Sequence, residues 1–238
     1  MISPSAPEAA RPAIAPALQG TAGSFTRLRR SEHQAVRSHR SFDPHVVGEL
    51  ECAAWVAYYR RDWIAFVGSA LRVSRHVFGL SWKTTIQCSW LVLRANQLWA
   101  PYPGDDAERS RRMMERFYRI VQQLYAEPFD PATAADLEVE WWRAHRDHQR
   151  WPCAGDCPAL ADALARLYSH VYDIPEQLAR SAAEQRALAM RYSDQWVSEG
   201  CPRGSAMVAR ERDALVRSYR ALLTAVRPEP REQHRRRR

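Results

Sequence analysis

Apolar residues recur every three or four positions along most of the chain between residues 43 and 226, which is the spacing of one helix face. A clear example is the predicted helix with Phe117, Val121 and Leu124 in its apolar stripe. Much of the rest of this helix is filled by Arg109, Arg111, Arg112, Arg116 and Arg119. No segment shows a sustained apolar-polar alternation bounded by Asn-Gly or Asp-Gly, the pattern typical of strands. The periodicity therefore predicts an all-α domain.

Residues that start and stop helices divide this pattern into a single bundle of about seven helices over residues 42–226. Asp43-Pro44 and Asp130-Pro131 each place a capping carboxylate before a proline, a combination typical of helix starts. Gly79 is a predicted stop. The apolar pattern weakens around residues 60–62, so the first segment is either one bent helix or two. The predicted helices span approximately residues 44–78, 81–99, 105–125, 131–150, 157–171, 175–200 and 205–226.

The positive charge lies at the two ends of the chain. The net charge is +8, of which residues 1–42 (six Arg, two acids) and 227–238 (six Arg, two Glu) carry +4 each, so the body sums to zero. We expect a Pro/Ala- then Arg-rich disordered N-terminal tail over 1–41 and an Arg-rich disordered C-terminal tail over 227–238. The tail around His234 to Arg238 could contact phosphate or an acidic partner.

The composition argues against several classes of protein. Lys83 is the only lysine and Asn96 the only asparagine, a bias that a high-GC genome explains, so the arginine content is weak evidence for nucleic-acid binding. The longest apolar run, residues 52–59, is far shorter than the roughly 20 residues of a membrane span. The cysteine number is odd and the first residues do not resemble a secretory signal, so we expect a reduced, cytoplasmic protein. The five cysteines are Cys52, Cys88, Cys153, Cys157 and Cys201.

Several polar side chains fall within apolar helical stretches and predict an aromatic-lined pocket between helices. Glu51 is surrounded by apolar positions, and a buried carboxylate is costly unless it is paired or binds a ligand. Glu138 and His145 share a face of their helix at spacings of four and three around Trp142. The candidate pocket residues are Glu51, Tyr58, Arg94, Asn96, Glu138, Trp142 and His145.

A packing role explains the same residues without a ligand. In that interpretation Glu51 pairs with an arginine such as Arg94, Asn96 makes a hydrogen bond between helices, and His145 lies at the boundary of the core.

Metal chemistry receives little support. His145, His148, Cys153 and Cys157 are competent zinc ligands within thirteen residues, but their spacing departs from the common zinc patterns. No glutamate has a histidine three residues later, as a ferritin-like di-iron site requires. The only acidic run, at residues 105–108, is explained by helix capping, and the second cluster of a terpene synthase is missing.

Two hypotheses about function follow. The favoured one is a non-catalytic interaction or structural protein whose polar core residues serve packing. The alternative is a small-molecule-binding bundle, or an enzyme with a carboxylate/His site that could include a metal, in a pocket between helices. DNA reading as the main task is disfavoured because the predicted helices are long. The sequence identifies no cofactor and no definite partner, and it leaves the oligomeric state open, homo-oligomers included.

Overall fold

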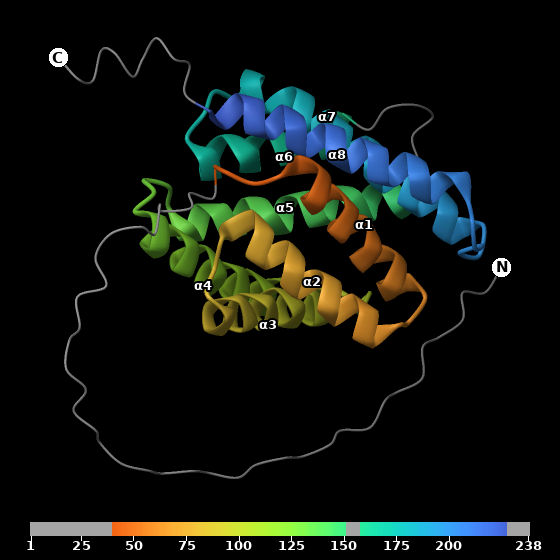
Figure 1. Ribbon diagram of the computed structural model, residues 1–238. Coiled ribbons are helices and arrows are strands. Elements are labelled where there is room, and N and C mark those ends of the chain that lie inside the picture. The colour runs from red at the N-terminus through yellow and green to blue at the C-terminus, as the bar shows by residue number, and fades with distance from the viewer. Residues whose placement is uncertain (1–39, 151–157, 228–238) are drawn as a thin grey trace. The chain divides into compact units, whose positions relative to one another are not determined.

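The computed structural model describes residues 40–150 and 158–227, and over these ranges the chain folds into helices without a strand, which confirms the predicted all-α class (Figure 1). The predictions for the two ends, 1–41 and 227–238, concern stretches that lie almost entirely outside the described residues. The helices are α1 (Pro44–Tyr59), α2 (Trp63–Phe78), α3 (Trp82–Trp99), α4 (Ala107–Tyr125), α5 (Pro131–Arg150), α6 (Pro158–Tyr172), α7 (Glu176–Ser198) and α8 (Ala206–Val226).

The described part of the chain has one helix more than the seven expected, because the first predicted segment is two helices. α1 ends at Tyr59, and Arg61 adopts a positive φ of 59°, which a continuous helix does not allow. The carboxylate of Asp62 then accepts a hydrogen bond from the backbone N–H of Ala65 at 3.1 Å and so caps α2. The weak pattern at residues 60–62 is thus a helix break.

The predicted caps are present. Asp43 accepts a hydrogen bond from the backbone N–H of His45 at 2.9 Å at the start of α1. Gly79 ends α2 with a left-handed φ of 57°. Of the two acids before α4, Asp106 is the cap, whereas Asp105 pairs with Arg146 of α5 at 3.4 Å. Local sequence therefore sets where these helices begin and end.

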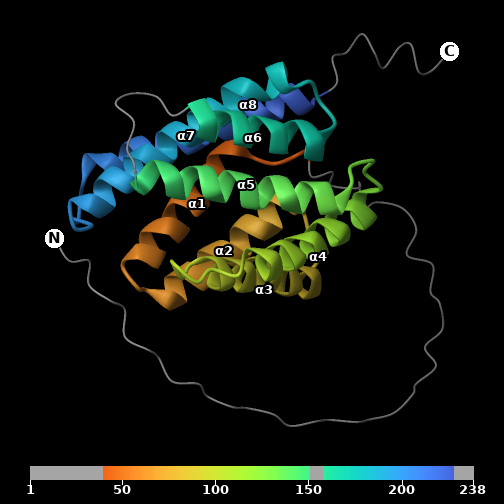
Figure 2. The same ribbon diagram turned by 180° about the vertical axis from the view of Figure 1, so that it is seen from behind.

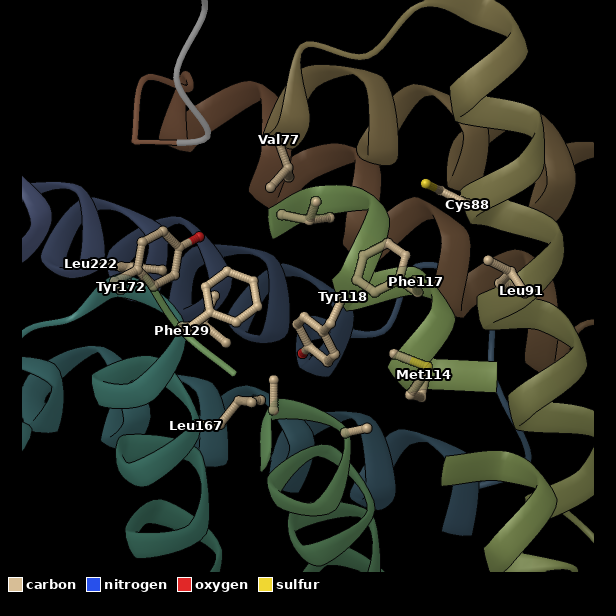
Figure 3. Close-up of a cluster of buried hydrophobic side chains, with 14 of the residues drawn as sticks. Val77, Cys88, Leu91, Met114, Phe117, Tyr118, Phe129, Leu167, Tyr172 and Leu222 are labelled. Carbon is tan, nitrogen blue, oxygen red and sulfur yellow. The ribbon is translucent and has the colours of Figure 1, made fainter. Parts of the chain in front are cut away.

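Each helix packs against its neighbours in the chain, and α1 also packs against α8. In both views α6, α7 and α8 lie on one side of α5, and α2, α3 and α4 lie on the other (Figures 1 and 2). The largest hydrophobic core contains residues of all these helices, and Figure 3 shows side chains from α2, α3, α4, α6 and α8 meeting in it. A smaller apolar cluster, Cys52, Ala189, Ala214 and Leu215, joins α1 to α7 and α8. The pair α2 and α3 packs more sparsely than the other neighbours.

α1 and α8 approach each other closely because α1 carries a glycine at the crossing. A Cβ atom at Gly48 would lie 2.7 Å from Cγ2 and 2.9 Å from the backbone nitrogen of Val216, and backbone cannot move aside cheaply. Gly68 on α2 has open space, since the nearest atom to its Cβ would be a guanidinium nitrogen of Arg72 at 3.9 Å.

We expect opposite results from alanine at these two glycines. Gly48→Ala should lower the free energy of unfolding by about 1–3 kcal/mol through overpacking. Gly68→Ala should raise it by about 0.5–1 kcal/mol, because alanine favours the helix when nothing obstructs its Cβ. Urea denaturation of both variants checks this, and equal stabilisation by the two substitutions would contradict the close approach of α1 to α8.

Candidate functional site

Glu51 lies in the interior, where α1 meets α7 and α8, and its carboxylate is fully paired. The side chain of Arg186 on α7 forms an ion pair with it, and Arg186 Nη1 donates to Glu51 Oε2 at 2.8 Å. The hydroxyl of Tyr219 on α8 donates to the same oxygen at 2.5 Å, and the indole of Trp55 donates to Oε1 at 3.3 Å. Glu51 is thus held by three helices, and its partner is Arg186 rather than Arg94.

This ion pair keeps Arg186 charged. Burial is the largest single effect and acts to lower the pKa of Arg186. The carboxylate of Glu51, together with Tyr219 and Tyr168, more than offsets burial and raises the pKa well above its ordinary value. The pair is a buried one, since only 14% of the Arg186 side chain and 9% of the Glu51 side chain are exposed.

Glu211 on α8 is a second buried carboxyl, and one of its oxygens has no partner among the described residues. Only 2% of the residue is exposed, and no hydrogen-bond partner among the described residues reaches its Oε2. Burial, then the negative charge of Glu51, raises the pKa of Glu211 from 4.5 to about 8, although Arg186 acts in the opposite direction. Glu211 is therefore largely protonated at neutral pH.

Both carboxyl groups line a cavity of about 60 Å³ between α1, α5, α7 and α8. Aromatic side chains from α1 and α5 form much of its wall, and the remaining wall is polar or aliphatic. The lining residues are Glu51, Trp55, Tyr59, Trp141, His145, Arg186, Ala189, Met190, Ser193, Glu211 and Leu215.

His145 reaches this cavity from α5 and is held by α7. Its Nε2 donates to Oδ2 of Asp194 at 3.1 Å, and Gln149 donates to the other carboxylate oxygen of Asp194 at 2.7 Å. About a fifth of each of the His145 and Asp194 side chains is exposed, so this pair lies at the edge of the interior. The structure thus brings two of the predicted site residues, Glu51 and His145, to one cavity.

Glu138 and Trp142 lie on α5 but do not line the cavity. The hydroxyl of Tyr118 on α4 donates to Glu138 Oε2 at 2.6 Å. Burial raises the pKa of Glu138, while hydrogen bonds from Tyr118, Trp141 and Trp142 act to lower it. Trp142 packs in the main core, with its ring centroid 5.9 Å from that of Trp99. These contacts pack α5 against α4 and against the end of α3.

Tyr58, Arg94 and Asn96, which the sequence assigned to the pocket, are placed elsewhere by the structure. Tyr58 packs against the rings of Trp63 and Phe66 at the α1–α2 corner, with centroids 6.0 and 5.6 Å away. Arg94 donates to Gln97 one turn along α3. Asn96 donates to the carbonyl oxygen of Val92 in its own helix at 2.9 Å, so it makes no bond between helices there.

Sequence reasoning missed the residues that complete the site, although their positions carried a signal. Glu211 occupies an apolar-periodic position of α8, between Val208 and Leu215 at spacings of three and four. Arg186 stands midway between Ala182 and Met190 on α7 in the same way. A charged residue at a core position of a helix was the same criterion that had singled out Glu51.

The structure does not describe all of the candidate zinc ligands. Cys153 and Cys157 lie outside the described residues, and His145 is held by Asp194. Across residues 40–150 and 158–227, no three His, Cys, Asp or Glu side chains form a group that could hold a metal ion. In the same ranges Cys52, Cys88 and Cys201 are free thiols, and burial raises the pKa of Cys52 to about 12, which makes that thiol unreactive.

The fold and the cavity define a class of protein, an all-α bundle with a small, partly charged cavity between four of its helices. None of the described helices is both long and apolar enough to cross a membrane. No family model, curated protein or solved structure matches the chain.

Proposed function

We propose that this protein binds a small amine, as its ammonium ion, in the cavity between α1, α5, α7 and α8. The observation that carries the proposal is the Oε2 atom of Glu211, a buried carboxyl oxygen without a donor among the described residues. Buried polar atoms nearly always have a hydrogen-bond partner, and leaving one without a partner is costly. An ammonium N–H would supply the missing donor and a compensating charge.

The walls of the cavity suit the same ligand. Trp55, Tyr59 and Trp141 present aromatic rings, which attract cations through their π-faces. The one arginine in the wall, Arg186, is already neutralised by Glu51, so Glu211 is the acid left to recognise a positive charge. A cavity of about 60 Å³ holds roughly four to six water-sized groups, which limits the ligand to a few heavy atoms.

Calorimetric titration of the full chain with methylammonium and ethylammonium chloride tests this function. The best small ligands gain about 1.5 kcal/mol per heavy atom. Ethylammonium should therefore reach a Kd no tighter than about 0.5 mM, and methylammonium, which is one carbon smaller, no tighter than about 6 mM. Binding should release protons at pH 7, because Glu211, with a pKa of about 8, must ionise to pair with the cation. The heat should therefore change with the ionisation enthalpy of the buffer.

Glu211→Gln should abolish both the binding and the proton release, because the amide cannot pair with a cation. The matched control is Glu199→Gln, which alters an exposed carboxylate beyond the end of α7 and should bind as the unaltered chain does. Equal binding by the two variants, or no heat beyond that of sodium chloride, would contradict the proposal.

The ligand-binding hypothesis from the sequence also includes an enzyme with a carboxylate/His site, which would use the same cavity. Its acid–base group would be His145, oriented by Asp194.

A non-catalytic interaction role in the cytoplasm, the function that the sequence favours, is the second candidate. The specific observation in its support is the exposure of large apolar side chains on α2 and α3, since extended apolar surface is typical of binding sites. This role uses a different surface from the cavity, so the two proposals can be tested separately.

A further inference from the structure

Most of the exposed large apolar side chains of the described residues lie on two neighbouring helices, α2 and α3. Ile64 on α2 is 91% exposed, and Trp82, Ile86 and Trp90 on α3 are each more than half exposed. Exposed single apolar residues are ordinary, but large ones that gather in one place mark interaction sites. We call Ile64, Val67, Trp82, Ile86 and Trp90 the α2–α3 face.

These residues point to the same side of the helix pair. α2 and α3 are antiparallel neighbours, and the hydroxyl of Ser89 donates to that of Ser74 at 3.2 Å, which identifies where the two helices meet. Successive residues of an α-helix are rotated by about 100° about the helix axis. Viewed along the axis of α2, Ile64 and Val67 therefore lie roughly 20–80° to one side of Ser74. Trp82, Ile86 and Trp90 lie roughly 20–100° from Ser89, and in an antiparallel pair this is the same side.

The interior side of the same two helices is distinct from this face. Val77 on α2 and Cys88 on α3 are buried in the main core (Figure 3). In both views of the ribbon, α2 and α3 lie on the side of the bundle remote from α6, α7 and α8 (Figures 1 and 2). The α2–α3 face is therefore separate from the cavity between α1, α5, α7 and α8.

The charge around the α2–α3 face has one sign. The segment 63–104 contains no Asp or Glu but carries Arg72, Arg75, Lys83 and Arg94, although the body of the protein as a whole is neutral. The guanidinium of Arg75 lies over the ring of Trp82, 4.5 Å from its centroid.

The other cations border the exposed apolar residues. Arg94 continues the row of Trp82, Ile86 and Trp90 at a spacing of four, and Lys83 directly follows Trp82. The acids that flank the segment are engaged elsewhere, because Asp62 caps α2 and Asp105 pairs with Arg146.

We propose that the α2–α3 face docks this protein onto the surface of an anionic lipid bilayer. Tryptophan prefers the interface between headgroups and acyl chains, where Trp82 and Trp90 would insert beside Ile86. The bordering cations, such as Lys83 and Arg94, would contact the lipid phosphates. A nucleic acid would match the charge but not the exposed isoleucines. The protein would bind at the membrane surface without crossing it. This docking gives the proposed interaction role a specific partner, and it rests on that role.

Co-sedimentation of the full chain with lipid vesicles tests the docking. The unaltered chain should bind vesicles of equal parts phosphatidylcholine and phosphatidylglycerol, and should bind phosphatidylcholine alone at least about tenfold more weakly. The triple variant Trp82→Ser/Ile86→Ser/Trp90→Ser should lose about tenfold or more of the partition coefficient, because it removes the inserted groups. The matched control, Leu124→Ser/Leu178→Ser, alters two exposed leucines on other helices and should bind unchanged.

A charge variant, Lys83→Gln/Arg94→Gln, should bind severalfold more weakly and with a smaller response to added salt. Circular dichroism of every variant confirms that the helices remain, as expected for changes at exposed or half-exposed positions.

Three results would overturn the docking. The first is the absence of vesicle binding by the unaltered chain. The second is a triple variant that binds vesicles as well as the unaltered chain, while deletion of residues 228–238 abolishes binding. Vesicle binding would then be due to the basic C-terminal end. The third is self-association, seen by sedimentation equilibrium and abolished in the triple variant, without vesicle binding. That result would keep the interaction role, with a second copy of the chain as the partner. If the chain neither binds vesicles nor self-associates, both the docking and the interaction role are contradicted.

Discussion

Replacing Glu51 with Gln should lower the free energy of unfolding by about 3–5 kcal/mol, the usual effect of removing one partner from a buried ion pair. The reason is the isolation of Arg186, whose guanidinium would stay buried without its counter-charge. Tyr219 would also lose the carboxylate that accepts its hydroxyl at 2.5 Å. Thermal and urea unfolding at pH 7 measure the loss.

A double-mutant cycle separates the ion pair from general damage to the interior. Arg186→Met alone should also destabilise, because Glu51 then remains as a buried, partly unpaired carboxylate. The double variant Glu51→Gln/Arg186→Met should be more stable than the sum of the two losses predicts. Glu49→Gln changes an exposed carboxylate of the same helix and should have little effect. Additive losses at Glu51 and Arg186 would show that the two side chains do not depend on each other.

Replacing Glu211 with Gln should have the opposite effect and raise the free energy of unfolding at pH 8 by about 4 kcal/mol. The pKa of this carboxyl is about 8 in the folded chain, against an ordinary value of 4.5. At a pH between these two pKa values, Glu211 has already lost its proton in the unfolded chain but still holds it in the folded chain. Stability associated with Glu211 is therefore complete below pH 4.5, falls as the pH rises toward 8, and is lost above it.

The pH dependence distinguishes this effect from an ordinary change in packing. Because Gln does not titrate, the gain from Glu211→Gln should be close to zero at pH 4 and grow steadily to pH 8. Urea unfolding of both proteins at several pH values measures it. A gain that is the same at every pH would mean that the pKa of Glu211 is not raised.

The substitutions at Glu51 and Glu211 therefore distinguish the two hypotheses from the sequence, in which buried polar residues serve either packing or the binding of a small molecule. Glu51 has the contacts of a packing residue, since three side chains from α1, α7 and α8 satisfy it. Glu211 is the residue on which the proposed amine binding depends, because its Oε2 atom has no hydrogen-bond partner among the described residues. The same substitution at Glu211 should raise stability and abolish amine binding.

The cavity was only partly predictable from the sequence. Glu51 and His145 were found because an ionisable residue in an apolar stretch must meet something in the interior. The same criterion, applied to α7 and α8, would have found Arg186 and Glu211. It could not exclude Arg94 or Asn96, because each of these side chains finds its partner within its own helix.

The sequence by itself determined the helices of this protein, since caps such as Asp43 and Ser81 and the three-to-four spacing of apolar residues act within a few positions of each other. Only the tertiary structure decided which buried charges meet. Glu51 contacts Arg186, 135 residues away, and Tyr219, 168 residues away. Such pairs depend on how the helices cross, and periodicity shows which face of a helix is buried but not which helix covers it.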